Sequence, residues 1–111
     1  MIYKRWDIIA VHFPFLEGID AKRRPALIIS ADRLYSEHSL YWIAMITTAK
    51  SGQRPKDVAV TNLERAGLPE ACVIRVPRLA TVSDQQIARR LGDLIPKDRN
   101  AVSALLKQSV P

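Results

Sequence analysis

The sequence is poor in the residues that carry disulfide, thiol and metal chemistry. Its 111 residues include one cysteine and two histidines. A single cysteine excludes an internal disulfide, and neither His12 nor His38 has a sequence context that pairs it with Cys72 in a catalytic thiol site. The same scarcity argues against a structural zinc site. Cys72 stands in an apolar run, so we expect it to be a small buried residue.

Long apolar runs and carboxylate clusters are also missing. The longest apolar runs, such as 42–46 and 26–29, are far too short to span a bilayer. The apolar stretch after Lys4 and Arg5 is interrupted by His12 and Pro14, and no small-residue cleavage site follows it. We therefore expect a cytoplasmic protein with no membrane partner. No carboxylate cluster suits a two-metal site, so we expect no metal and no other cofactor.

Positive charge is what the sequence has in excess. The formal net charge is +6, and the pI is about 9.9. Residues 71–111 carry seven Lys or Arg against three Asp or Glu, whereas residues 1–70 carry ten against eight. A basic surface favours a polyanion such as nucleic acid, or an acidic protein partner. Solubility alone is the alternative explanation.

Short β-rich segments separated by turn clusters predict a small barrel or sandwich. There is no linker or repeat, so we expect one domain over residues 1–111. The expected strands are 7–13, 25–30, 41–48, 57–61, 72–76 and 79–82. We expect a loop at 51–55, a turn around Gly67 at 65–69, and a single helical turn at 83–86. One convincing helix ends the chain, and its apolar residues at helical spacing are Ala101, Val102, Leu105, Leu106 and Val110.

Arg24 is the strongest candidate for phosphate chemistry. It directly precedes Pro25 and the apolar run Ala26–Ile29. Proline fixes φ and tends to occupy the first residue of a strand, which would hold Arg24 at a strand mouth. A guanidinium group placed there matches phosphate oxygens bidentately. The alternative is an ordinary surface arginine whose stem lies along the strand.

Three further positions can be singled out from residue type alone. Thr47 and Thr48 end the expected strand 41–48, and a hydroxyl there can donate to a phosphoryl oxygen. Alternation places only one of the two on a given face, and β-propensity alone also accounts for threonine. Arg75 lies in an otherwise apolar strand, so it requires a partner or an anionic ligand.

Several segments, taken in order, resemble the MazF/PemK toxins of type II toxin–antitoxin pairs. The segments are Trp6-Asp7-Ile8, Phe13-Pro14-Phe15, the strand Arg24–Ser30, Ala44–Thr48, Val73-Ile74-Arg75, Ala80-Thr81-Val82 and Arg90–Leu94. The resemblance implies a mainly β fold with a C-terminal helix, a small SH3-like barrel of the MazF/CcdB type. It also implies a homodimer and neutralisation by an acidic cognate antitoxin.

The activity that the resemblance implies is metal-independent, sequence-selective cleavage of single-stranded RNA through the ribose 2′-hydroxyl. Catalytic roles pass to Arg24 and to Thr47, which matches the family's hydrophobic-Thr pair, with Thr48 as the neighbouring alternative. The positions that would border or bind the RNA are Glu17, Asp20, Lys22, Arg23, Thr48, Arg75 and Arg78. Pro77 and Ala80 stand where some relatives carry an aspartate and an arginine, which leaves the general base and the RNA preference open.

Two other functions remain in view. The first is a non-catalytic nucleic-acid-binding barrel, favoured by the basic C-terminal half and by Pro77. The second is a CcdB-like inhibitor of a protein target such as gyrase, which would have no need of a phosphate site at Arg24 and Thr47. Trp6 and Trp42 could stack on bases, but packing in the core or in a dimer interface is the preferred interpretation.

Overall fold

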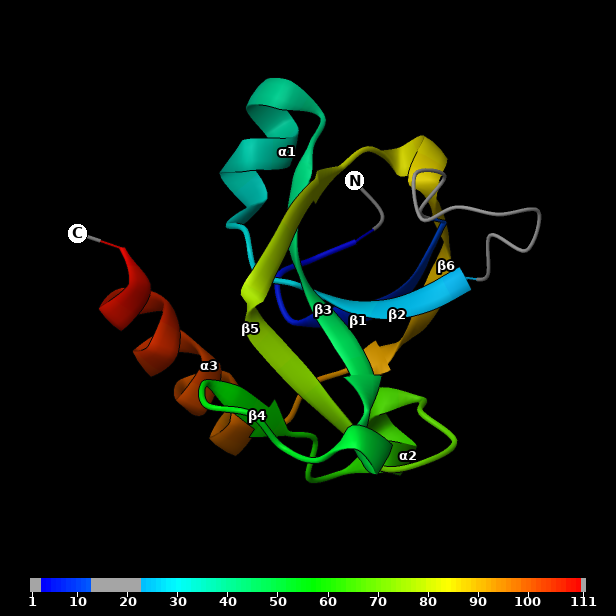
Figure 1. The fold of residues 1–111 in the computed structure, drawn as a ribbon. Helices are drawn as coiled ribbons and strands as arrows, with labels where there is room; N and C mark the ends of the chain where they lie inside the picture. The colour runs from blue at the N-terminus through cyan, green and yellow to red at the C-terminus, as the bar shows by residue number, and fades with distance from the viewer. Residues whose placement is uncertain (1–2, 13–22, 111) are drawn as a thin grey trace.

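The computed structural model describes residues 3–12 and 23–110, and its centre is one antiparallel sheet (Figure 1). The six strands have the order β4-β5-β3-β2-β1-β6. They are β1 (Asp7–His12), β2 (Arg23–Ile28), β3 (Tyr41–Thr48), β4 (Asp57–Ala59), β5 (Cys72–Val82) and β6 (Ile87–Asp93). The helices are α1 (Asp32–His38), α2 (Leu63–Ala66) and α3 (Pro96–Ser109), with 3₁₀ turns at Ala49–Ser51 and Asp84–Gln86.

The prediction of a mainly β fold with a C-terminal helix is confirmed. The sheet is strongly curved but not closed, because β4 and β6 remain its two edges among the described residues. The expected barrel is therefore an open one. In the described ranges, no helix combines the length and the apolar character needed to cross a membrane.

Alternation along the strands divides the core between the two faces of the sheet. On one face, which we call the α3 face, Leu27, Ala44 and Ile74 belong to the same buried cluster as Val102 of α3. On the other face, which we call the Tyr41 face, the buried cluster contains Ile9, Ala26, Ile28, Tyr41 and Ile43. Each fully buried aliphatic side chain contributes about 1.5–3 kcal/mol, so both faces hold the sheet in place.

Strand β2 begins earlier than expected. It starts at Arg23 and contains Pro25 as its third residue, whereas Pro25 was expected at the first position. Pro25 pairs with Ala10 of β1, but pairing with β3 begins only at Ala26. One side of the proline therefore carries no ladder, which is where a residue without an N–H is tolerated. Arg24 is thus part of the strand and not a residue before it.

Strand β5 joins two predicted strands into one. The segments 72–76 and 79–82 were expected to be separate around Pro77, but β5 runs through them without a break. Its pairing with β3 shifts between Met45–Arg75 and Ala44–Leu79, so Val76, Pro77 and Arg78 form a bulge. The bulge removes the proline from the regular hydrogen-bond ladder. Strand β4 is also shorter than the expected 57–61.

Three elements were not predicted. Helix α1 has no buried residue and therefore no apolar stripe that periodicity could detect. Helix α2 is a single turn where only a turn around Gly67 was expected. Strand β6 contains two adjacent exposed arginines, Arg89 and Arg90, which interrupt the strand pattern. The turn at Asp84–Gln86 was predicted, and Ser83 and Gln86 form a capping box there.

The apolar pattern of the last helix is only partly buried. Val102 is fully buried, and Leu105 and Leu106 pack against the core, but Ala101 and Val110 are exposed. The stripe is therefore narrower than predicted, because α3 covers only the part of the sheet near β4 and β5 (Figure 1).

The cysteine and the two tryptophans differ in how deeply they are buried. Cys72 is a buried free thiol, as expected. Trp6 packs against the core cluster of the α3 face, with the Arg5 guanidinium 4.6 Å from its ring centre. Trp42 is 53% exposed, so core packing is wrong for this residue. Leu79 is 52% exposed, and both side chains line a shallow groove.

Candidate anion-binding site

Arg24 and Thr47 come from neighbouring strands and share the Tyr41 face. Ala26 belongs to the core cluster of this face and pairs with Met45, which packs against the same cluster. Arg24 and Thr47 each lie two residues beyond that pair, so alternation places them on the same side of the sheet. Arg24 is exposed and Thr47 is half-buried. One ligand could therefore contact both side chains where the N-terminal end of β2 lies beside the C-terminal end of β3.

Arg75 joins the same face from strand β5. It pairs directly with Met45, and the next row pairs Thr47 with Val73. Diagonal neighbours across a sheet lie about 7–8 Å apart at the Cα atoms, which is within reach of a long side chain. Arg24, Thr47 and Arg75 thus lie on one face of three adjacent strands, with Met45 in the middle strand.

Arg75 has the partner that its apolar strand requires. Its Nε donates to Asp57 Oδ1 at 3.1 Å, and its Nη2 donates to Asp57 Oδ2 at 3.0 Å. The backbone N–H of Arg54 donates to the same Oδ2 at 2.8 Å. The Asp57 side chain is 0% exposed and the Arg75 side chain is 14% exposed. Asp57 was expected only as the start of a strand, and the unsatisfied arginine was the signal that pointed to a partner.

The ion pair sets the ionisation of both groups. Hydrogen bonds from Arg75 lower the pKa of the Asp57 carboxyl, and this effect outweighs burial, which acts in the opposite direction. The same hydrogen bonds raise the pKa of the Arg75 guanidinium. The pair is therefore charged at neutral pH and carries no net charge.

The remaining predicted site residues are not all on this face. Thr48 follows Ala44 and Ile46 by alternation and so lies on the α3 face. Arg78 is exposed in the β5 bulge, and Arg23 is exposed and pairs with His12 of β1. The loop positions Glu17, Asp20 and Lys22 lie outside the described residues.

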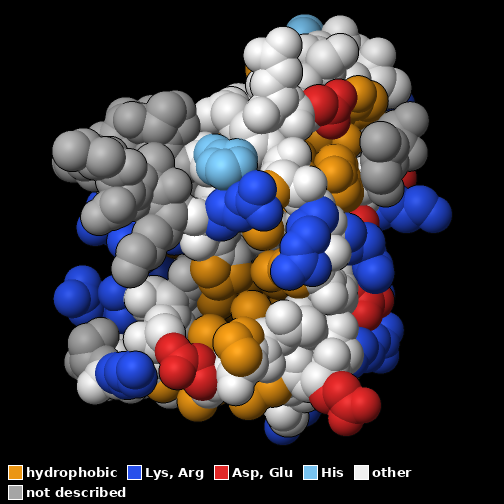
Figure 2. Space-filling view, turned by 90° about the vertical axis from the view of Figure 1, so that its right-hand side faces the viewer, with side chains coloured by type: hydrophobic (Ala, Val, Ile, Leu, Met, Phe, Trp, Pro, Cys, Tyr) orange, Lys and Arg blue, Asp and Glu red, His pale blue; other side chains and the backbone are white. Residues whose placement is uncertain are grey.

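Two arginines, Arg89 and Arg90, are exposed on the edge strand β6, beside β1. Arg90 is paired with Asp7, whose Oδ1 accepts from the guanidinium Nε at 3.1 Å. Figure 2 faces the side on which β6 lies in Figure 1 and shows both basic and acidic side chains around a central apolar area. Such a mixture suits a ligand that has both charged and flat apolar groups. Among the described residues, no group of three or more His, Cys, Asp or Glu side chains could hold a metal ion.

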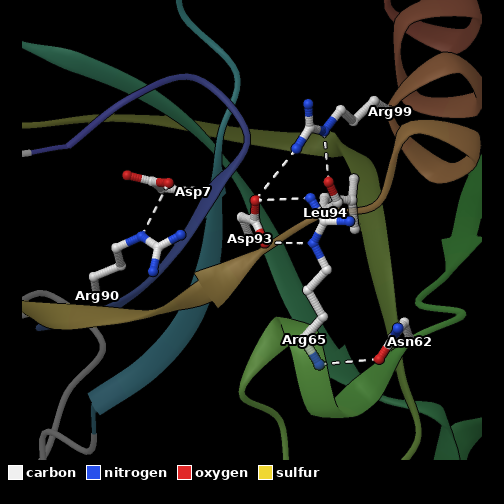
Figure 3. A network of polar contacts seen from close by, with 7 residues as sticks. All are labelled: Asp7, Asn62, Arg65, Arg90, Asp93, Leu94 and Arg99. Carbon is white, nitrogen blue, oxygen red and sulfur yellow. Dashed lines mark hydrogen bonds and ion pairs between the residues drawn. The ribbon is translucent and has the colours of Figure 1, made fainter.

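A second arginine–carboxylate cluster joins β6 to α2 and α3 (Figure 3). Asp93 at the end of β6 accepts from Arg65 Nε of α2 at 2.8 Å and from Arg99 Nη2 of α3 at 3.3 Å. Hydrogen bonds from Arg65 lower the pKa of Asp93. Backbone also approaches backbone here, because a Cβ on Gly92 would lie 2.1 Å from the carbonyl oxygen of Arg65. This cluster fastens two helices to β6.

The fold and the site together define a small basic β-sheet protein with a candidate site for a phosphate-like anion. A family model, the PemK-like, MazF-like toxin of type II toxin–antitoxin systems, matches residues 4–110. The chain belongs to this family.

Solved structures share the fold at low sequence identity. MazF from Deinococcus radiodurans has a TM-score of 0.77 at 16% identity, covering 98% of this chain and 96% of that one. The toxin MazF-mt6 of Mycobacterium tuberculosis has a TM-score of 0.73 at 19% identity, covering 93% and 94%. An endoribonuclease from a mycobacterial species, in complex with its cognate antitoxin, has a TM-score of 0.72 at 16% identity, covering 98% and 95%. No curated protein matches the sequence.

Proposed function

We propose that the protein is a metal-independent, sequence-selective endoribonuclease toxin that cleaves single-stranded RNA. The observation that carries the proposal is the shared face of Arg24, Thr47 and Arg75, which offers a hydroxyl and two guanidinium groups to one phosphate. Membership of a toxin family and the fold shared with an endoribonuclease support the same conclusion.

In the proposed reaction, the ribose 2′-hydroxyl attacks the neighbouring phosphorus while the 5′-oxygen leaves. The products are a 2′,3′-cyclic phosphate and a 5′-hydroxyl. Arg24 and Thr47 stabilise the charge that develops on the non-bridging oxygens, and Arg24 also lies near the leaving oxygen. A base must accept the 2′-proton and an acid must protonate the leaving oxygen. Exposed arginines elsewhere on the surface hold further phosphates.

Incubation of a long single-stranded transcript with the pure protein in EDTA tests the proposal. Wild type should cleave it, and Arg24→Ala should lose at least about 10²–10³ in rate, because it removes a donor aimed at the developing charge. Thr47→Ala should lose somewhat less. Both variants should stay folded and bind RNA with modestly reduced affinity, because other cations still contact phosphates.

Arg23→Ala is the matched control and should remain active, since Arg23 neighbours Arg24 but falls on the other face by alternation. If Arg23→Ala fails while Arg24→Ala cleaves normally, the assignment is shifted by one residue. If wild type binds the transcript without cleaving it, the protein is a nucleic-acid-binding module and not a nuclease.

The proposed partners are a second copy of the chain and an acidic antitoxin. Exposed Trp42 and Leu79 support a homodimer, because large apolar side chains at the surface favour association. A monomer in sedimentation at micromolar concentration would count against it. The net charge of +6 supports an acidic antitoxin segment that occludes Arg24 and Arg75. If expression of this protein stops cell growth, co-expression of a small acidic protein encoded directly upstream of it should restore growth.

A further inference from the structure

Among the described residues, the carboxylate bonded to Arg75 is one of the most constrained. The Asp57 carboxylate accepts three hydrogen bonds, two from the Arg75 guanidinium group and one from the Arg54 backbone. Its side chain is 0% exposed. A carboxylate with both oxygens engaged and no solvent contact cannot reach a ribose hydroxyl, and its lowered pKa makes it a poor general base. Its effect on any reaction must therefore pass through Arg75.

Asp57 engages one particular edge of the guanidinium group. The hydrogen bonds use Nε and one N–H of Nη2, and within the described residues no group accepts from Nη1. The edge formed by Nη1 and the second N–H of Nη2 is left for another acceptor. A guanidinium group offers five donors in a fixed fork, so holding one edge fixes the direction of the other.

We propose that Asp57 is a positioning residue for RNA cleavage, which holds Arg75 so that its Nη1 edge meets the phosphate bound by Arg24 and Thr47. The inference rests on the proposed nuclease function. Asp57 pairs directly with Arg75 from the adjacent strand, so it orients this arginine and does not replace the general base that Pro77 leaves open.

The Asp57–Arg75 pair has no net charge. Asp57 therefore orients the Arg75 guanidinium group and also neutralises its positive charge. Asp57→Asn should therefore lower kcat about 10–100-fold, as loss of an outer-shell partner does at other sites. The same change adds one positive charge, so KM for the transcript should stay equal or fall. A purely structural role would lower the amount of active protein without improving KM.

The experiment measures kcat and KM of folded wild type and variants on one transcript. Arg75→Gln should lose about 10²–10³ in kcat. In the Arg75→Gln background, Asp57→Asn should have no further effect on kcat, because Asp57 acts only through Arg75. Additive losses would overturn the proposal. Asp93→Asn is the matched control: it removes another arginine-bound carboxylate and should leave kcat of the folded protein unchanged.

Arg75→Lys provides a second variant in case Asp57→Asn does not fold. It keeps the ion pair and the charge but lacks the free edge, so kcat should again fall by at least 10-fold. Wild-type kcat in Arg75→Lys, or in folded Asp57→Asn, overturns the positioning role while the nuclease function stands. If wild type does not cleave RNA at all, the nuclease function and this inference fail together.

Discussion

Asp57 and Asp93 are both bound by arginine, but their surroundings give the two ion pairs different roles. The Asp57 side chain is 0% exposed, and its partner Arg75 lies on the adjacent strand of the same sheet. Asp93 is 24% exposed and is shared by Arg65 and Arg99, which belong to two different helices. Burial and three hydrogen bonds to its carboxylate allow Asp57 to fix the direction of the Arg75 guanidinium group. The more exposed Asp93 instead joins α2 and α3 to β6.

The largest expected difference between the two is in stability. Asp57→Ala leaves Arg75 without its partner in a nearly buried position, which should lower the free energy of unfolding by about 3 kcal/mol. Asp93→Ala breaks pairs that water already screens and should cost about 1 kcal/mol. Urea unfolding of both variants at neutral pH measures the difference. An equal or larger loss for Asp93→Ala would contradict the comparison.

A smaller effect should appear in the pH dependence of stability. The pKa of Asp57 is lower in the folded protein than in the unfolded chain, because Arg75 binds its charged form. Its contribution is therefore complete above the unfolded pKa of about 4 and is lost as the pH falls through the folded value. We expect wild type to lose more stability than Asp57→Asn when urea unfolding is repeated at about pH 3. Parallel losses would show that the ion pair does not contribute.

The smallest expected effect concerns salt. The side chain of Arg65 is 44% exposed, so raising NaCl from about 0.05 M to about 0.5 M should remove most of the destabilisation caused by Arg65→Ala. The destabilisation caused by Asp57→Ala should persist, because the buried pair is screened much less. Thermal unfolding at the two salt concentrations compares the variants. Equal salt sensitivity would mean that burial does not distinguish the pairs.

The residue pattern predicted most strands of the sheet and one requirement of the candidate site. Strand β3 was predicted with its observed limits because it is rich in aromatic and β-branched residues. Strand β6 was missed, since Arg89 and Arg90 stand side by side where alternation would place an apolar residue. The need of Arg75 for a partner could be predicted. The identity of that partner, Asp57, could not be predicted. It follows from the register between β4 and β5, and the residue pattern of one sequence does not show which strands pair.

The bulge in β5 has a consequence for how the chain can vary in length. Val76, Pro77 and Arg78 separate two stretches of regular pairing with β3, one containing Arg75 and the other containing Leu79. Val76 is buried in the core of the α3 face, whereas Pro77 and Arg78 are exposed. A residue lost or gained at Pro77 or Arg78 would therefore change the size of the bulge and leave the pairing on either side in place. The chain can thus vary in length between Arg75 of the candidate site and Leu79 of the exposed groove while both keep their pairing with β3.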